Sequence, residues 1–147
     1  MSTPLPPSIP TVLVVDDEPI SRRVAYRTLS EQGCRVLEAA SAAETLDALR
    51  MMNRPVDLVL VDVVMPGTDG VELAEQIFAE FPDQRILFMS AYPAEVLAQR
   101  GLQDLRVLFL AKPYTRVQLT AKVGEAMRRT AAVDRETPIE SGSGRGP

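Results

Sequence analysis

Asp62 is the residue in this 147-residue chain whose surroundings most need a chemical explanation. It follows a run of apolar residues at 58–61, and aliphatic residues also follow it before Pro66 and Gly67 turn the chain. A carboxylate among apolar side chains is costly unless a cation or a hydrogen-bond donor pairs with it. Four other polar residues stand in the same way after apolar runs, and they are Asp16, Asp17, Ser90 and Lys112. These five side chains are the candidates for a site.

Three of the five are carboxylates, and together they predict a site for a divalent cation. Carboxylates brought close to one another repel unless a cation lies among them. The chain contains no histidine, so Asp16, Asp17 and Asp62 offer oxygen ligands alone, a set that favours a hard ion. Mg²⁺ commonly takes one or two carboxylates while keeping several water ligands. The sequence therefore predicts Mg²⁺ as the cofactor.

Lys112 and Ser90 beside such an ion predict a site for a phosphoryl group. The cation and the ammonium group would neutralise phosphoryl oxygens, and the Ser90 hydroxyl would donate a hydrogen bond. Asp62, central on a buried strand, is then the predicted nucleophile, giving an aspartyl phosphate. Each residue alone has an ordinary structural interpretation: acidic residues cap helices, a serine forms a turn and a lysine lies on the surface. Their coincidence at matching strand ends favours the chemical interpretation.

Five apolar runs, beginning near residues 12, 35, 58, 86 and 107, predict the strands that position these side chains. Each gap between them has room for one helix and two short loops, as a right-handed parallel crossover requires. The alternation predicts a single α/β domain with a doubly wound, five-stranded parallel sheet, and its functional crevice lies at the carboxyl ends of the strands. The second strand, which ends in Glu38, Ala39 and Ala40, is expected to contribute nothing comparable to the site, as an edge strand away from the crevice would not.

Helices are predicted after Pro19, over 42–52, after Asp69, after Pro93 and after Thr115, which caps the last one. Their inward faces are predicted from apolar residues at helical spacing. These inward residues are Ile20, Val24, Ala25 and Leu29 in the first helix, Leu46 and Leu49 in the second, Ala74, Ile77, Phe78 and Phe81 in the third, and Val117, Leu119, Val123, Ala126 and Met127 in the last.

Composition and the chain ends give further expectations. Residues 1–10 are rich in proline and predict a flexible arm, and residues 131–147 predict a disordered tail. The net charge of −4 argues against direct nucleic-acid binding, and no apolar run is long enough to span a membrane. The single cysteine, Cys34, and the lack of a secretory signal pattern favour a cytoplasmic protein.

Four stretches carry a resemblance to a known family. They read Val-Val-Asp-Asp-Glu at 14–18, Asp-Val-Val-Met-Pro-Gly-Thr-Asp-Gly at 62–70, Met-Ser-Ala at 89–91 and Lys-Pro-Tyr at 112–114. Residues 11–130 resemble the receiver domain of two-component response regulators. The resemblance implies a flavodoxin-like sheet with strand order 2-1-3-4-5 and a phosphoryl group received from a sensor histidine kinase or a histidine phosphotransfer protein. It also implies a chain that catalyses only its own phosphorylation and dephosphorylation, and so is not an enzyme for other substrates.

The resemblance further implies a role for each site residue. Asp62 is the implied phosphoacceptor. The implied metal ligands are the carboxylates of Asp17 and Asp62, the backbone carbonyl of Val64 and, through metal-bound water, Asp16; the implied ligands of the phosphoryl oxygens are Ser90 and Lys112. Ala91 leaves room for the phosphoryl group, and the peptide bond between Lys112 and Pro113 is expected to be cis.

Ser90 and Phe109 are the implied switch residues. Phosphorylation would draw Ser90 inward and let the ring of Phe109 rotate, which would move the face built from the fifth strand and the fourth and fifth helices. That face is the implied contact for a downstream protein or for a second copy of the chain. A core aromatic on a central strand is an equally compatible interpretation of Phe109. Without a hydroxyl group, its ring would switch through packing alone.

Val64 and Tyr92 stand where receivers place the two side chains that flank the water attacking the aspartyl phosphate. Val64 has no donor or acceptor to orient a water molecule, and Tyr92 is bulky enough to shade the site. A persistent phosphoryl state is therefore expected, unless a phosphatase or a histidine partner removes the group.

Other functions with this fold compete for the same residues. A flavodoxin-type cofactor module needs phosphate-binding donors in the first strand-to-helix loop, where residues 16–19 offer three acids and a proline. A Mg²⁺-dependent phosphohydrolase with an aspartyl nucleophile is chemically closer, but residues 63–65 provide no second acid. A degenerate receiver that serves only as an interaction surface conflicts with the complete acceptor set. The choice between a stand-alone receiver and part of a hybrid histidine kinase stays open, because residues 86–93 resemble both.

Overall fold

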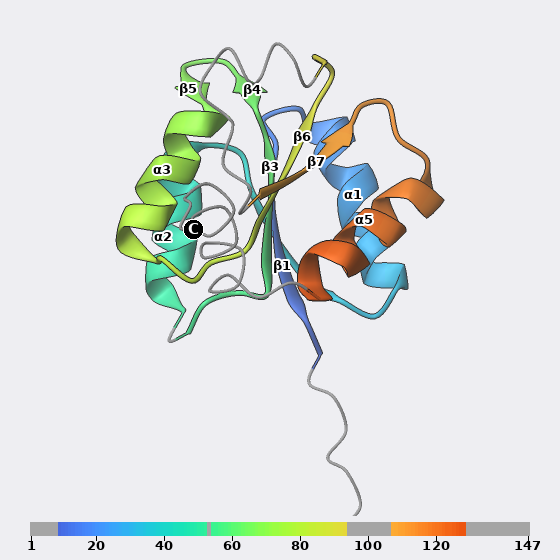
Figure 1. The fold of residues 1–147 in the computed structure, drawn as a ribbon, viewed down its shortest axis with the longest axis horizontal. Helices are drawn as coiled ribbons and strands as arrows, with labels where there is room; N and C mark the ends of the chain where they lie inside the picture. Colours follow the sequence, from blue (N-terminus) through green and yellow to red (C-terminus); the bar gives the residue numbers. More distant parts are fainter. Residues whose placement is uncertain (1–8, 53, 94–106, 129–147) are drawn as a thin grey trace, which may run out of the picture.

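The computed structural model describes residues 9–52, 54–93 and 107–128, and a parallel sheet forms its centre (Figure 1). The strands of the sheet are β1 (Thr11–Val15), β2 (Arg35–Ala39), β3 (Leu58–Asp62), β6 (Ile86–Ser90) and β7 (Val107–Ala111). Their spatial order is β2-β1-β3-β6-β7, and every neighbouring pair is parallel. Counted as the five predicted strands, this is the order 2-1-3-4-5, so the predicted doubly wound sheet is confirmed.

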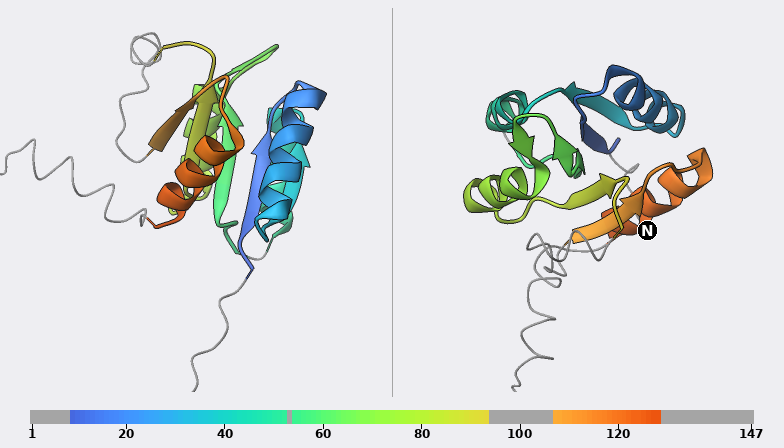
Figure 2. Two further views of the ribbon diagram at one scale, coloured as in Figure 1. Left: turned by 90° about the vertical axis from the view of Figure 1, so that its right-hand side faces the viewer. Right: turned by 90° about the horizontal axis from the view of Figure 1, so that it is seen from above.

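Helices cover both faces of the sheet. They are α1 (Pro19–Glu31), α2 (Ala42–Met51), α3 (Gly70–Glu80) and α5 (Arg116–Arg128). The pair α2 and α3 covers one face, and the pair α1 and α5 covers the other (Figure 1 and Figure 2). The helix predicted after Pro93 falls in residues 94–106, outside the described residues. Residues 1–8 of the predicted arm and the predicted tail at 131–147 also lie outside them, so these three predictions stay untested.

Strands β1 and β3 are buried on both faces, which explains the unbroken apolar runs at 12–15 and 58–61. Successive side chains point to opposite faces of a strand. Leu13 and Val59 therefore pack into the core beneath α2 and α3, whereas Val12 and Leu58 pack into the core beneath α1 and α5. All four side chains are fully buried. A strand that fills two cores at once has no solvent face on which polar residues would alternate.

The inward faces of the helices are confirmed for most of the predicted residues. Ala25, Leu29, Leu49, Ala74, Ile77, Leu119, Val123 and Ala126 are buried, and Leu46, Phe78, Phe81 and Met127 are partly buried against the core. The prediction is wrong for Ile20, Val24 and Val117, whose side chains are 74%, 48% and 77% exposed. Successive helical residues are rotated by about 100°, so Ile20 and Val24 share a stripe beside the buried one, and Val117 lies opposite Leu119.

The chain between β3 and α3 folds back in a tight hairpin that the sequence pattern does not predict. Strands β4 (Val64–Met65) and β5 (Thr68–Asp69) pair antiparallel across Pro66 and Gly67. Gly67 has a φ of +71°, the left-handed conformation that a type II turn requires after a proline. The predicted turn at Pro66 and Gly67 is therefore confirmed, while the two short strands beside it are an addition.

Gly70 brings the returning arm of this hairpin against the end of β3. Its N–H donates a hydrogen bond to the carbonyl oxygen of Val63 over 2.7 Å. A Cβ atom at this position would lie 2.6 Å from the carbonyl oxygen of Asp62 and 2.7 Å from the Cα atom of Val63, which is closer than non-bonded atoms approach. The backbone around Asp62 is therefore held by a contact that needs glycine.

Gly70→Ala is expected to lower the free energy of unfolding by about 1–3 kcal/mol, because the added methyl group forces the backbone at Asp62 to move. Gly124→Ala is the matched control. A Cβ atom there meets only Nη1 of Arg128, at 3.3 Å, and alanine is favoured over glycine inside a helix by about 0.5–1 kcal/mol. Urea denaturation measures both changes. Equal stability of Gly70→Ala and the wild type would contradict the close contact.

Candidate functional site

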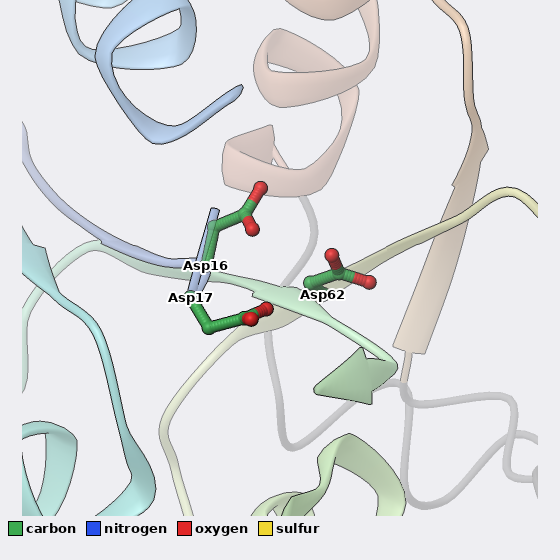
Figure 3. Close-up of side chains that lie close together, drawn as sticks. All are labelled: Asp16, Asp17 and Asp62. Atoms are coloured by element: carbon green, nitrogen blue, oxygen red, sulfur yellow. The ribbon is translucent and has the colours of Figure 1, made fainter. Parts of the chain in front are cut away.

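The carboxyl ends of four strands meet at one edge of the sheet and bring the predicted site residues to that edge. Asp16 and Asp17 follow β1, Asp62 ends β3, Ser90 ends β6 and Lys112 follows β7. Figure 3 shows the three aspartates gathered where β1 and β3 end. One carboxylate oxygen from each aspartate lies within 4.8 Å of the other two. The acidic cluster expected from the sequence is therefore present in the structure.

Lys112 connects two of these carboxylates. Its Nζ atom donates to Oδ2 of Asp16 over 3.1 Å and to Oδ2 of Asp62 over 3.0 Å. The backbone N–H of Lys112 donates to the carbonyl oxygen of Ser90 over 2.8 Å, and the peptide bond to Pro113 is cis, as expected. The side chain is only 20% exposed, so the interpretation of Lys112 as a surface lysine is wrong.

Burial and charge shift the pKa values of the two central groups. Burial raises the pKa of Asp62 above the ordinary value for aspartate, and Lys112 and the N–H of Val64 oppose this rise without cancelling it. Burial alone would lower the pKa of Lys112, but the hydrogen bonds and charges of Asp62 and Asp16 outweigh it and raise that pKa. Lys112 is therefore a firmly held positive charge, whereas the ionisation of Asp62 costs free energy.

Asp16 and Asp17 differ in how their carboxylates are engaged. Asp16 is fully buried, and its two carboxylate oxygens accept hydrogen bonds from Lys112 and from the N–H of Glu18. Asp17 is partly exposed, and no donor in the described part of the chain contacts its carboxylate. One ammonium group facing three carboxylates leaves negative charge that a divalent cation can neutralise, and Asp17 is the acid with free oxygens.

Ser90 and its neighbours lie beside the acidic cluster. Ser90 is fully buried, and its Oγ atom accepts a hydrogen bond from the N–H of Tyr92 over 2.9 Å. Ala91 is exposed, and the side chain of Tyr92 is 47% exposed. An open pocket of about 440 Å³ adjoins Lys112, and its lining residues are Ser21, Val24, Ala91, Lys112, Pro113 and Tyr114. The exposed Val24 therefore lines a pocket that adjoins Lys112.

The structure shows the positions of Val64 and Phe109, and their predicted roles stay predictions. The N–H of Val64 donates to Oδ1 of Asp62 over 3.1 Å, and its side chain is 40% exposed. Phe109 lies in the middle of β7 beside Phe88 of β6 and packs, partly buried, against the core beneath α2 and α3. The core interpretation of Phe109 therefore holds, and its role as a switch stays a prediction.

Three residues near the site were not identified from the sequence, namely Arg22, Glu38 and Gly70. Arg22 donates to the carbonyl oxygen of Asp16 and to the carboxylate of Glu38 in β2. Glu38 of β2 is not part of the acidic cluster, as expected, but it contacts the loop that follows β1 indirectly, through Arg22. One signal was available: a basic residue in the first turn of a helix opposes the helix dipole and so needs another reason to be there.

The chain also matches known proteins in sequence. The family model of the response regulator receiver domain matches residues 12–124. The chain is 36% identical over 119 residues to the sensor kinase CckA of Brucella abortus, a match that covers 81% of this chain and 13% of the kinase. It is 32% identical over 134 residues to the phosphate regulon transcriptional regulatory protein PhoB of Pseudomonas aeruginosa, covering 90% of this chain and 58% of that protein. The chain thus spans only part of the length of these relatives.

Solved structures resemble the fold over most of the chain. The receiver domain of the hybrid histidine kinase CckA has a TM-score of 0.66 and 31% identity, and the match covers 80% of this chain and 98% of that one. The response regulator TrrA of Thermotoga maritima, solved in complex with Mg²⁺-BeF, has a TM-score of 0.70 and 29% identity, covering 80% of this chain and 99% of that one.

Within the described residues, no helix has the length and apolar character needed to cross a membrane. The sheet order, the acidic cluster at its carboxyl edge and the sequence matches agree with one another. Because the family match covers most of the chain and solved receiver domains share its fold, the chain belongs to the response regulator receiver domains of two-component systems.

Proposed function

We propose that the protein accepts a phosphoryl group on Asp62 in a Mg²⁺-dependent reaction, and that the donor is a phosphohistidine of a sensor histidine kinase or a histidine phosphotransfer protein. The observation that carries this proposal is the Lys112 ammonium group, 3.0 Å from Asp62 and 3.1 Å from Asp16. An acidic acceptor, a held positive charge and a site for a second cation are what phosphoryl transfer to a carboxylate needs.

The residues at the strand ends fit a Mg²⁺ ion. One carboxylate oxygen from each of the three aspartates lies within 4.8 Å of the other two, and oxygen ligands are the ones that Mg²⁺ prefers. Asp17, Asp62 and the carbonyl group of Val64 would hold the ion directly. Asp16, whose oxygens already accept hydrogen bonds, would act through water. When bound, the ion neutralises negative charge on the carboxylates and on the phosphoryl oxygens.

In the proposed transfer, a carboxylate oxygen of Asp62 forms a bond to phosphorus while the bond from phosphorus to the imidazole nitrogen of the donor breaks. That nitrogen keeps the electron pair of the broken bond. Lys112 would remain beside the transferred group as a point charge. The Ser90 hydroxyl would donate to a phosphoryl oxygen, because its oxygen accepts from Tyr92 and its hydrogen contacts no acceptor within the described residues. Ala91 adds only a methyl group and leaves room at the site.

The proposed output surface is the face of β7, α5 and the fourth predicted helix, of which β7 and α5 lie within the described residues. Phe109 lines an open pocket of about 450 Å³ there, together with Gln118, Ala121 and Lys122 of α5. Movement of Ser90 toward the phosphoryl group would free the ring of Phe109 to repack, and this surface would then bind a downstream protein or a second copy of the chain. The chain would catalyse its own phosphorylation and dephosphorylation alone. The match to CckA in sequence and in fold favours a hybrid histidine kinase as its context.

Treatment with Mg²⁺ and acetyl phosphate is expected to add one phosphoryl group to the wild type, because Asp62 is the acceptor that Lys112 and the ion activate. Intact mass spectrometry should show one adduct on the wild type and none on Asp62→Asn. Asp47→Asn, which changes an exposed acid of α2, is the control and should keep the adduct. The same stoichiometry on Asp62→Asn would refute the assignment.

Asp17→Ala is expected to weaken Mg²⁺ binding about tenfold or more and to slow phosphorylation with it, since the ion supplies charge to both steps. Lys112→Ala should retain most of the Mg²⁺ affinity but separate phosphorylation from any change on the surface of β7 and α5. Calorimetry measures the affinity, and intact mass over time measures the reaction. Phosphorylation of Asp17→Ala at the wild-type rate would overturn the metal assignment.

Asp62→Asn is expected to make the Mg²⁺-free protein more stable at pH 7. Because burial raises the pKa of Asp62, the folded protein binds this proton more tightly than the unfolded chain does. Stability is therefore lost as pH rises from the ordinary aspartate range through the raised pKa, and asparagine avoids that loss. The gain should disappear near about pH 3, where aspartate is protonated in both states.

Thermal unfolding in EDTA across this pH range measures the effect, with each kcal/mol worth roughly 2–8 °C in a domain of this size. Asp47→Asn is again the control, because its carboxylate is largely exposed. A lower melting temperature for Asp62→Asn than for the wild type at pH 7 would show that the ionised Asp62 is not a cost to the fold.

The lifetime of the aspartyl phosphate is expected to be long. Val64 and Tyr92 are the side chains that we propose to flank the attacking water, and both are exposed at the carboxyl edge of the sheet. Val64→Asn would supply a group that orients water, and Tyr92→Ala would open the approach, so each should speed hydrolysis. First-order decay of the phosphorylated proteins is the measurement. Unchanged or slower decay in both variants would mean that these positions do not control the water.

A further inference from the structure

The side chain of Arg22 contacts the loop that follows β1. Its Nη1 atom donates to the carbonyl oxygen of Asp16 over 2.7 Å, and its Nε atom donates to Oε1 of Glu38 over 2.9 Å. The side chains of Arg22 and Glu38 are only 19% and 23% exposed. Because the guanidinium group is planar, fixing two of its nitrogens fixes its orientation. The short bond to the carbonyl of Asp16 is therefore held in place by a residue of β2.

This contact holds backbone rather than a side chain. The carbonyl oxygen of Asp16 belongs to the peptide group whose nitrogen is that of Asp17. A hydrogen bond to this oxygen therefore fixes the orientation of the peptide plane that leads into Asp17. Asp17 is the acid whose carboxylate has free oxygens within the described residues. On the other side of Asp16, its N–H donates to the carbonyl oxygen of Ala39 over 3.1 Å. The end of β2 thus holds Asp16 directly through Ala39 and indirectly through Glu38 and Arg22.

We infer that Arg22 and Glu38 are positioning residues for the metal site, with Glu38 orienting Arg22 and Arg22 fixing the peptide group between Asp16 and Asp17. The inference rests on the proposed function in one respect, which is that Asp17 is a ligand of Mg²⁺. Neither residue touches the ion or the phosphoryl group. Their effect is to hold the Asp17 carboxylate ready beside Asp62, so that less ordering is needed when the ion binds.

Charge and positioning make opposite predictions for Arg22, which makes the inference testable. A positive side chain repels a nearby cation, so on charge alone the removal of Arg22 would strengthen Mg²⁺ binding. Loss of positioning would weaken it. A weaker affinity after Arg22 is removed therefore cannot come from the charge of the lost group.

The experiment measures the dissociation constant of Mg²⁺ by calorimetry for the full chain and its variants. Arg22→Gln is expected to raise the dissociation constant roughly tenfold, the size of effect seen when supporting contacts of a metal site are lost. Arg22→Lys, which can still donate to the carbonyl of Asp16, should recover part of the affinity. Arg23→Gln is the matched control, because Arg23 also pairs with Glu38, over 3.4 Å, but donates no hydrogen bond to Asp16. It should stay within about twofold of the wild type.

A double-mutant cycle tests whether Glu38 acts through Arg22. Glu38→Gln alone should weaken Mg²⁺ binding about threefold, because Arg22 loses the group that orients it and the site loses a nearby negative charge. The double variant Arg22→Gln with Glu38→Gln should lose less affinity than the sum of the two single losses, because the positioning contact can be lost only once. Additive losses would show that the two residues act independently and would overturn the proposed order of action.

A spectroscopic readout separates positioning from a general loss of stability. The backbone amide signal of Asp17 in nitrogen-15 NMR of the metal-free protein should shift in Arg22→Gln and stay near its wild-type position in Arg23→Gln. Circular dichroism at the same temperature selects the variants that are folded. If Arg22→Gln is unfolded, Arg22→Lys and Glu38→Gln decide the question, because each keeps one half of the contact.

The outcomes also separate this inference from the proposed function. Unchanged Mg²⁺ affinity in Asp17→Ala would overturn the metal assignment itself. Loss of affinity in Asp17→Ala, together with wild-type or tighter binding in Arg22→Gln, would overturn the positioning role and leave the metal assignment standing. An equal loss in Arg23→Gln and Arg22→Gln would also overturn the positioning role.

Discussion

The carboxyl edge of this sheet depends on one ammonium group held between two carboxylates that come from different strands. Lys112 reaches Asp16 and Asp62 together because the strands β1, β3 and β7 end at a common level. Burial makes the ionisation of Asp62 costly, and a single lysine offsets only part of that cost. The carboxyl edge therefore keeps negative charge that Lys112 does not neutralise. In the proposed mechanism, the metal ion neutralises this charge, and the phosphoryl group enters a site that already contains two cations.

The fold could be predicted from the sequence where burial on both faces of a strand requires a run of apolar residues. Strands buried on two faces must be apolar throughout, so the runs at β1, β3 and β6 were visible without any periodicity. The inward faces of the helices were harder to predict, because the apolar character of a side chain does not determine whether it faces the sheet or the solvent. Ile20 and Val24 are apolar yet point away from the sheet, and packing rather than composition decides this. The strands β4 and β5 have two residues each, too few to leave a pattern.

The candidate site divides in the same way. Asp62 and Lys112 stand at strand ends, and the topology of a parallel sheet brings such ends together whatever the details of packing. Arg22, Glu38 and Gly70 were beyond the reach of that reasoning. Their importance comes from contacts that appear only in the folded chain: a guanidinium group that joins the loop after β1 to β2, and a glycine in close contact with the end of β3. The residues at the strand ends could therefore be predicted from the sequence, whereas the residues that support them could be identified only from the contacts in the folded structure.

The β4–β5 hairpin has a consequence for how this domain tolerates change. The residues before and after the hairpin are in contact, since the N–H of Gly70 donates to the carbonyl oxygen of Val63 over 2.7 Å. The excursion between them is thus a closed loop whose tip, at Pro66 and Gly67, is exposed. Extra residues inserted at that tip would lengthen the hairpin away from Asp62, because the hydrogen bond between Gly70 and Val63 closes the hairpin at its base. The hairpin tip is therefore a suitable place to insert a peptide. A label on that peptide would lie only a few residues from Asp62 in sequence and would report on the surroundings of Asp62.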